Sequence, residues 1–160
     1  MSKQFSIAAA LSLSCLAIAA CSSEPEETAV SAEEGIPGLS ISNARLMLPP
    51  VAGNPAAIYM DIAYDGERGV AIRSVDVADA ARAELHDVME YDFEMTMMEM
   101  PGLTLQPGDR VSFEPGGKHV MAFELSPELQ AGGTTEVTFT IAGGDKQSFD
   151  VPVMAAGEER

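Results

Sequence analysis

The strongest constraint on the fold is a set of short runs in which polar and apolar residues alternate. Residues 135–141 read TEVTFTI, an alternation of period two that is typical of a strand with one buried face. Residues 58–62 and 70–75 are further short strand-like runs, separated by clusters of Pro, Gly, Asn and Asp. Residues 143–145, Gly-Gly-Asp, predict a hairpin turn into residues 147–151. No stretch of ten residues keeps a helical period, so we predict an all-β sandwich of seven to nine short strands.

The first twenty residues have the features of an export signal. Lys3 supplies a positive charge, and residues 7–20 form an uncharged apolar run that is too short for a stable transmembrane helix. The run leads into Cys21 through the tetrapeptide Ile-Ala-Ala-Cys, which resembles the lipobox of bacterial lipoproteins. The resemblance implies that residues 1–20 are removed and that the Cys21 thiol is lipidated, which anchors the chain to a membrane. The alternative is an ordinary signal followed by a chance cysteine.

Composition divides the remainder of the chain. Residues 21–35 hold the cysteine and then five glutamates with no aromatic residue, so we predict a disordered acidic tether. Residues 36–154 are long enough for one domain with a single core, and residues 155–160 form a short tail. The net charge of −16 argues against a nucleic-acid partner, because phosphate binding requires clustered Lys and Arg.

Soft-metal ligands in the mature chain must come from methionine. Cys15 leaves with the signal, Cys21 is acylated, and an oxidising compartment disfavours free thiolates. Methionine is crowded around the two histidines of the chain, His86 and His119. The crowded residues are Met89, Met95, Met97, Met98, Met100 and Met121.

Strand geometry predicts that part of this cluster comes together. Alternation along a strand places His119 and Met121 on one face. Phe123 and Leu125 continue that face, so we expect it to run toward the core with the His-x-Met pair at its rim. His86 is expected to end an apolar stretch just before the loop that leads to the methionines.

Ligand softness selects the ion. Two neutral imidazoles and two thioethers favour Cu(I) over Zn²⁺, Ca²⁺ or Mg²⁺. Imidazole binds metal only when unprotonated, so affinity should fall below about pH 6.5. The alternative is two ordinary histidines beside methionines that fill the core, as Met60 is expected to do.

The spacing of four of these residues resembles a known signature. His86, Met97, His119 and Met121 give H-x10-M-x21-H-x-M, which is similar to the pattern of the periplasmic PCu(A)C-type copper chaperones. The flanking segments Ala-Glu-Leu before His86 and Glu-Pro-Gly-Gly at 114–117 agree as well. The resemblance implies a cupredoxin-like β-sandwich of the Greek-key type that holds one Cu(I) ion, with these four residues as its ligands.

The resemblance also implies partners and a location. It implies a periplasmic protein that delivers copper to the Cu(A) site of a cytochrome c oxidase subunit, often alongside a Sco-type thiol protein. A carrier that hands over its cargo is expected to be a monomer. Ser22 after the lipidated cysteine favours the outer membrane, by resemblance to lipoprotein sorting rules. Met95 and Met98 are candidates for shielding the ion or helping its transfer. No catalytic triad order, phosphate loop or carboxylate-ligated zinc pattern appears, so we predict that the protein is not an enzyme.

The chain departs from the family pattern at two places. Lys118 stands where the family often has an aromatic or aliphatic residue, and Met98-Glu99 stand where a basic residue often follows the second ligand. The tail after Met154 has no histidine, which predicts a single copper site. Two other functions stay open: a copper-buffering lipoprotein that uses the same site, and a metal-free structural lipoprotein.

Overall fold

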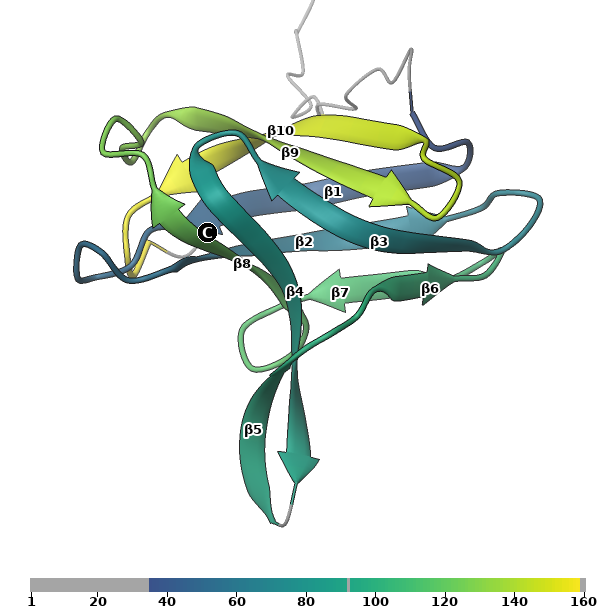
Figure 1. Cartoon of the computed structure of the whole chain (residues 1–160), viewed down its shortest axis with the longest axis horizontal. Coiled ribbons are helices and arrows are strands. Elements are labelled where there is room, and N and C mark those ends of the chain that lie inside the picture. The colour runs from purple at the N-terminus through teal and green to yellow at the C-terminus, as the bar shows by residue number, and fades with distance from the viewer. Residues whose placement is uncertain (1–34, 92, 159–160) are drawn as a thin grey trace, which may run out of the picture.

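The computed structural model describes residues 35–91 and 93–158, and these residues form ten β-strands and no helix (Figure 1). The predicted all-β class is confirmed. In the described part no helix could cross a membrane. Cys21, the signal and the tether lie outside the described residues. The strands are β1 (Leu39–Met47), β2 (Ala56–Tyr64), β3 (Val70–Val77), β4 (Ala80–Tyr91), β5 (Glu94–Glu99), β6 (Leu103–Leu105), β7 (Arg110–Phe113), β8 (His119–Leu125), β9 (Thr134–Ile141) and β10 (Lys146–Met154).

The strands build two layers through one continuous path of hydrogen bonds. Their order is β5-β4-β8-β2-β1-β10-β9-β3-β6, and β7 lies off this path and pairs with the second half of β2. The pair β1–β10 is parallel and joins the layer of β1, β2 and β8 to the layer of β9 and β3 (Figure 1). This arrangement places the β4–β5 end of the path at one edge.

Alternate residues of both layers fill a single core. Ile58, Met60 and Ile62 on β2 are buried against Val137 and Phe139 of β9. Their neighbours along each strand face outward, which explains the alternation of period two in the sequence. The expectation that Met60 is a core filler is confirmed.

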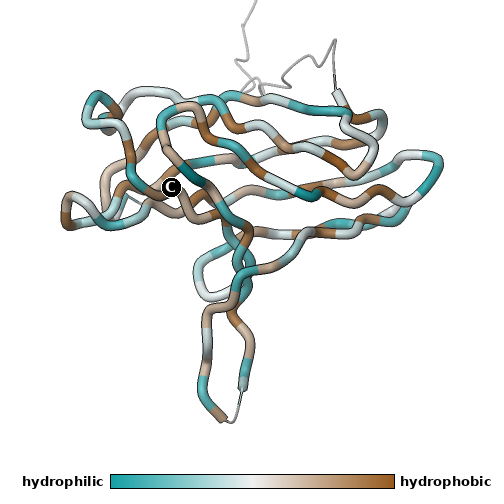
Figure 2. The backbone as a smooth tube through the Cα atoms, in the orientation of Figure 1, coloured by the Kyte–Doolittle hydropathy of each residue, from teal (hydrophilic) through white to brown (hydrophobic). Residues whose placement is uncertain are grey.

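β4 is longer than expected and projects from the sandwich. Its first part pairs with β8 up to His86, and its second part pairs with β5 from His86 onward. Figure 1 shows this β4–β5 hairpin extending away from the layers, and Figure 2 shows hydrophobic residues on it as well as in the body. The prediction that a loop follows His86 is therefore wrong, because β4 continues to Tyr91. The strand continues because β5 supplies the backbone partners that β8 no longer offers.

The expected orientation of β8 is also wrong for its middle residues. Val120 and Ala122 are fully buried in the core, whereas Met121 and Phe123 lie half-buried on the outer face. Only the opposite face of β8 is covered by the second layer, so the His119–Met121 face points outward. Leu125 packs against the edge of the core.

Candidate metal centre

The two histidines meet on neighbouring strands. His86 of β4 and His119 of β8 are direct partners in the antiparallel register. Their ring centroids lie 5.9 Å apart with planes tilted by 37°. Direct partners share one face of a sheet, so both imidazoles stand on the outer face. This pairing brings together two of the four residues that the sequence predicted as ligands.

Hydrogen bonds leave one nitrogen of each imidazole without a proton. The His119 Nδ1–H donates to the carbonyl oxygen of Gly117 at 2.8 Å, which leaves Nε2 with its lone pair. The His86 Nε2–H donates to the Glu84 carboxylate at 3.1 Å. His86 Nδ1 is then a buried acceptor with no hydrogen-bond partner in the described residues. A buried, unpartnered lone pair fits a metal ligand, and a hydrogen bond at the other ring nitrogen is how proteins orient such ligands.

Burial favours the neutral form of His86. The side chain of His86 is 13% exposed, and the whole of residue His119 is 4% exposed. Burial is the largest influence and lowers the pKa of His86 below its usual value; Glu99 raises this pKa and Arg82 lowers it. The net lowering favours the unprotonated imidazole that a metal requires.

The two predicted thioether ligands lie on the same outer face. Met121 is two residues from His119 and opposite Glu84, while Met97 on β5 is opposite Val88. Val88 is two residues from His86, so Met97 is its diagonal neighbour, a spacing that long side chains can bridge. All four predicted ligands thus share one face of three adjacent strands. Met121 is half-buried and Met97 is 51% exposed.

The other methionines of the cluster separate into two groups. Met95 faces the same side as Met97 but lies two residue pairs farther out, opposite Glu90. Met98 is opposite Asp87 and so belongs to the other face. Of these two, the register leaves Met95 alone on the ligand face.

Phe123 was expected on the face of His119, but the other neighbours of the histidines were not predicted from the sequence. The rings of Tyr59 and Phe123 lie 6.4 Å from His119 and from His86 respectively. Arg82 covers Phe123 at 4.0 Å and forms an ion pair with Glu84. Period two placed Phe123 on the face of His119 and could have placed Glu84 on the face of His86 in the same way, but the position of Tyr59 depends on the pairing of β2 with β8.

Lys118, a departure from the family pattern, has a structural role. Its Nζ lies 2.7 Å from a carboxylate oxygen of Asp87 on β4. The ion pair links the segment before His119 to the strand that carries His86. Lys118 therefore helps to hold the two histidine-bearing strands together.

The donors around the histidines are not those of a hard cation site. Across the described ranges, no three His, Cys, Asp or Glu side chains are grouped so that they could hold one metal ion. The histidine face also carries the thioethers of Met97 and Met121, which bind soft ions. The Glu84 carboxylate lies on the same face, where it pairs with Arg82 and with the His86 ring.

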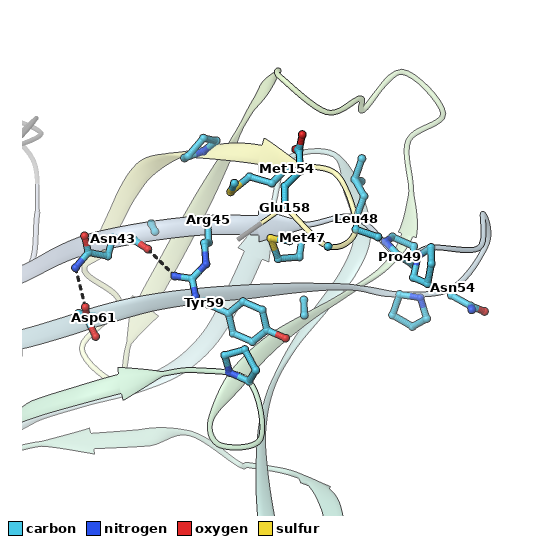
Figure 3. A pocket seen from close by; sticks show the side chains of 18 residues that line it. Asn43, Arg45, Met47, Leu48, Pro49, Asn54, Tyr59, Asp61, Met154 and Glu158 are labelled. Atoms are coloured by element: carbon cyan, nitrogen blue, oxygen red, sulfur yellow. Dashed lines mark hydrogen bonds between the residues drawn. The ribbon is translucent and has the colours of Figure 1, made fainter. Parts of the chain in front are cut away.

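A groove of about 790 Å³ lies on the outer side of β1 and β2 (Figure 3). Tyr59 lines it and also flanks His119, so the groove adjoins the histidines without containing them. Arg45 covers the Tyr59 ring at 5.3 Å, and Met47 and Met154 line the same groove as partners in the parallel pair. Of the four candidate ligands, Met97 on β5 is the most exposed, at 51%.

The sequence matches a known family and a curated relative. The family model described as "Putative lipoprotein LpqE-like" matches residues 39–153. The protein "Putative lipoprotein Lxx21020" of Leifsonia xyli subsp. xyli (strain CTCB07) is 25% identical over 117 residues, which cover 72% of this chain and 69% of the relative.

Solved structures share the fold. The copper-bound PCuAC domain from PmoF2 matches with a TM-score of 0.62 and 22% identity, over 76% of this chain and 96% of that domain. The solution structure of CuI-DR1885 from Deinococcus radiodurans matches with a TM-score of 0.60 and 20% identity, over 81% of this chain and 87% of that one. These matches confirm the predicted cupredoxin-like sandwich and the resemblance to PCu(A)C-type domains in fold.

Proposed function

This chain belongs to the LpqE-like family, and we propose that it is an anchored lipoprotein that binds one Cu(I) ion and passes it on. The proposed ligands are His86, Met97, His119 and Met121. The observation that carries the proposal is the pairing of the buried His119 with the half-buried His86 across β8 and β4, where the neutral imidazoles each keep a free lone pair. The match to structures named as copper-bound supports it.

Cu(I) suits this site better than a divalent ion. Four neutral ligands leave the site with a charge of +1, which costs less to bury than a dication. Thioether sulfur is polarisable and binds soft ions. Without a cysteine in the proposed set, the site lacks the thiolate of a blue-copper electron carrier. These properties favour carriage of the ion over redox chemistry.

The proposed ligand set also argues against an enzyme. The chain has two histidines, and both serve the metal in this proposal, so no further imidazole is left as a general base. Met97 lies on an edge strand and is half exposed, which would allow an incoming protein to compete for the ion.

We place the protein outside the cytoplasm on a lipid anchor. The family and the curated relative both carry the word lipoprotein in their descriptions. Lipidation at Cys21, a periplasmic location and the outer membrane are the specific proposals. Release of the chain from membranes by detergent but not by high salt, and its loss from the membrane in Cys21→Ala, would test the anchor.

The proposed recipient is the Cu(A) site of a cytochrome c oxidase subunit, with a Sco-type protein as a possible intermediate. A copper buffer with the same site is the second candidate. Oxidase activity in a strain without the gene separates the two. Loss of activity under scarce copper supports delivery, and sensitivity to excess copper alone supports buffering.

Titration of Cu(I) tests the site directly. The unlipidated chain competes with a coloured chelator under anaerobic, reducing conditions. We expect one tight equivalent, with affinity lower by on the order of 100-fold or more in His86→Ala and in Met121→Ala, since even the partners of a metal ligand contribute 10–100-fold. Circular dichroism of each variant checks that the fold is retained. No competition by the unaltered chain would leave a metal-free structural lipoprotein.

A further inference from the structure

The β4–β5 hairpin concentrates the exposed apolar surface. In the residues that the structure describes, seven large hydrophobic side chains are exposed, and six of them lie on this hairpin. Apolar residues are normally withdrawn from water unless a patch serves an interaction. The six are Met89, Tyr91, Phe93, Met95, Met97 and Met98.

Phe93, at the tip of the hairpin, is exposed in a way that does not stabilise the fold. It is 92% exposed, so its ring contributes nothing to the core. Its φ of 64° lies in the left-handed region, which costs a non-glycine residue roughly 1–2 kcal/mol. A strained backbone that presents an aromatic ring to solvent indicates a functional role.

The hairpin begins at the proposed copper ligands. His86 lies where β4 leaves β8, and Met97 stands on β5 between that base and the tip. β5 is the edge strand at one end of the strand order, and Figure 1 shows the β4–β5 hairpin projecting away from the sandwich. Met95 shares the face of Met97, whereas Met89 and Tyr91 stand on the opposite face. A protein that encloses the tip would therefore reach Met97 from the Met95 side.

We propose that the hairpin tip, defined by Met89, Tyr91, Phe93 and Met95, is the docking surface for the copper-accepting protein. The inference rests on the proposed function. The acceptor has an apolar patch for these side chains, and Lys or Arg residues around it. Cu(I) exchanges its imidazole and thioether ligands for those of the acceptor and stays Cu(I), so no electron is transferred.

Charge identifies a basic protein as the occupant. Glu90 and Glu94 are exposed among the apolar side chains of the tip, and the whole chain has a net charge of −16. Such charge disfavours an anionic lipid surface and a second copy of the chain. Acidic groups around an apolar centre instead complement a basic rim and speed encounter.

The size of the tip suits a short-lived complex. Aromatic side chains bury about 150–250 Å² each, so Tyr91 and Phe93 with two methionines form a small contact. Interfaces below about 1,200 Å² in total belong to weak, transient encounters. A carrier that releases its cargo requires such an encounter.

Two variants test the tip. Tyr91→Ser with Phe93→Asn removes the aromatic anchors, and Asn tolerates the left-handed backbone at position 93. Val51→Ser is the matched control, because Val51 is the exposed large hydrophobic residue outside the hairpin, at 60% exposure. Each protein is loaded with Cu(I) and mixed with a purified, soluble Cu(A)-binding oxidase domain or with a small Cu(I) chelator.

The two acceptors separate docking from binding. We expect the rate of transfer to the Cu(A) domain to fall about tenfold in the double variant, because aromatic anchors contribute much of the binding energy of an interface. The rate at which the chelator extracts Cu(I) should not change. Val51→Ser should behave like the unaltered chain. Transfer should also slow as salt rises from roughly 0.01 to 0.15 M, because the Debye length falls from about 30 to 8 Å.

Other outcomes overturn the proposal in distinguishable ways. Equal rates to the Cu(A) domain in all proteins, or no transfer from the unaltered chain, would exclude docking of this acceptor by the tip. Slower loss to both acceptors would mean that the tip acts on the copper site. If the unaltered chain binds phosphatidylglycerol vesicles and the double variant does not, the tip is a lipid-binding surface. If the unaltered chain sediments as a dimer and the double variant does not, the tip binds a second copy of the chain. Failure to load any copper would instead refute the proposed function.

Discussion

Met97 and Met89 show how one residue's face decides its chemistry. Both are 51% exposed and both lie on the β4–β5 hairpin, but only Met97 stands on the face of the histidines. Met97→Ala should weaken Cu(I) binding about tenfold or more through loss of a thioether ligand. Met89→Ala should leave the affinity unchanged in the same chelator competition. Equal losses in the two variants would contradict the proposed ligand set.

The charge on Glu99 should tune His86. Burial lowers the pKa of His86, and the Glu99 carboxylate, opposite it on β5, opposes that effect. In the copper-free protein, NMR of the imidazole should show a midpoint below 6.5, and Glu99→Gln should lower it further. Protons compete with Cu(I) at His86 only below its pKa, so binding through His86 weakens as pH falls through that value. A higher midpoint in Glu99→Gln would contradict this account.

At the scale of the element, β4 carries the core on one face and the candidate site on the other. Leu85 is 4% exposed and packs in the core, while the next residue, His86, faces outward. Leu85→Ala should lower the free energy of unfolding by about 2–5 kcal/mol, with Cu(I) affinity of the folded protein retained.

His86→Ala is the matched comparison for Leu85→Ala. It should lose Cu(I) affinity and lower the free energy of unfolding by less than Leu85→Ala does. Urea unfolding without copper and chelator competition with copper measure the two quantities. Loss of copper binding in folded Leu85→Ala would show that the two faces of β4 are not independent.

At the scale of the whole molecule, Gln147 ties the start of the domain to its last strand. Its buried side chain accepts a hydrogen bond from the Ile36 N–H at 3.1 Å and donates to the Leu39 carbonyl at 3.5 Å. Gln147→Leu would leave a buried N–H without a partner and should lower the free energy of unfolding by about 1–3 kcal/mol.

The adjacent Ser148 provides the control. Its hydroxyl pairs with that of Thr138 on the exposed face, so Ser148→Ala should change the free energy of unfolding by at most about 0.5 kcal/mol. Thermal or urea unfolding compares the two. An equal effect would show that the link to Ile36 does not hold the start of the domain in place.

The sequence by itself determined the strand content and the candidate ligand residues. The alternation in residues 135–141 appears as β9, and the Gly-Gly-Asp turn leads into β10 as expected. These signals are local, because side-chain direction alternates along any strand whatever it pairs with. The same rule placed His119 with Met121 on one face before any partner strand was known.

Only the tertiary structure decided which face is outside and which strands meet. Period two groups His119 with Met121 but cannot say whether the second layer covers that group, and it covers Val120 and Ala122 instead. His86 meets His119 because β4 pairs with one edge of β8. Tyr59 lies beside His119 because β2 pairs with the other edge of β8. Such pairing reflects the burial of the whole core, a property that no single stretch of sequence carries.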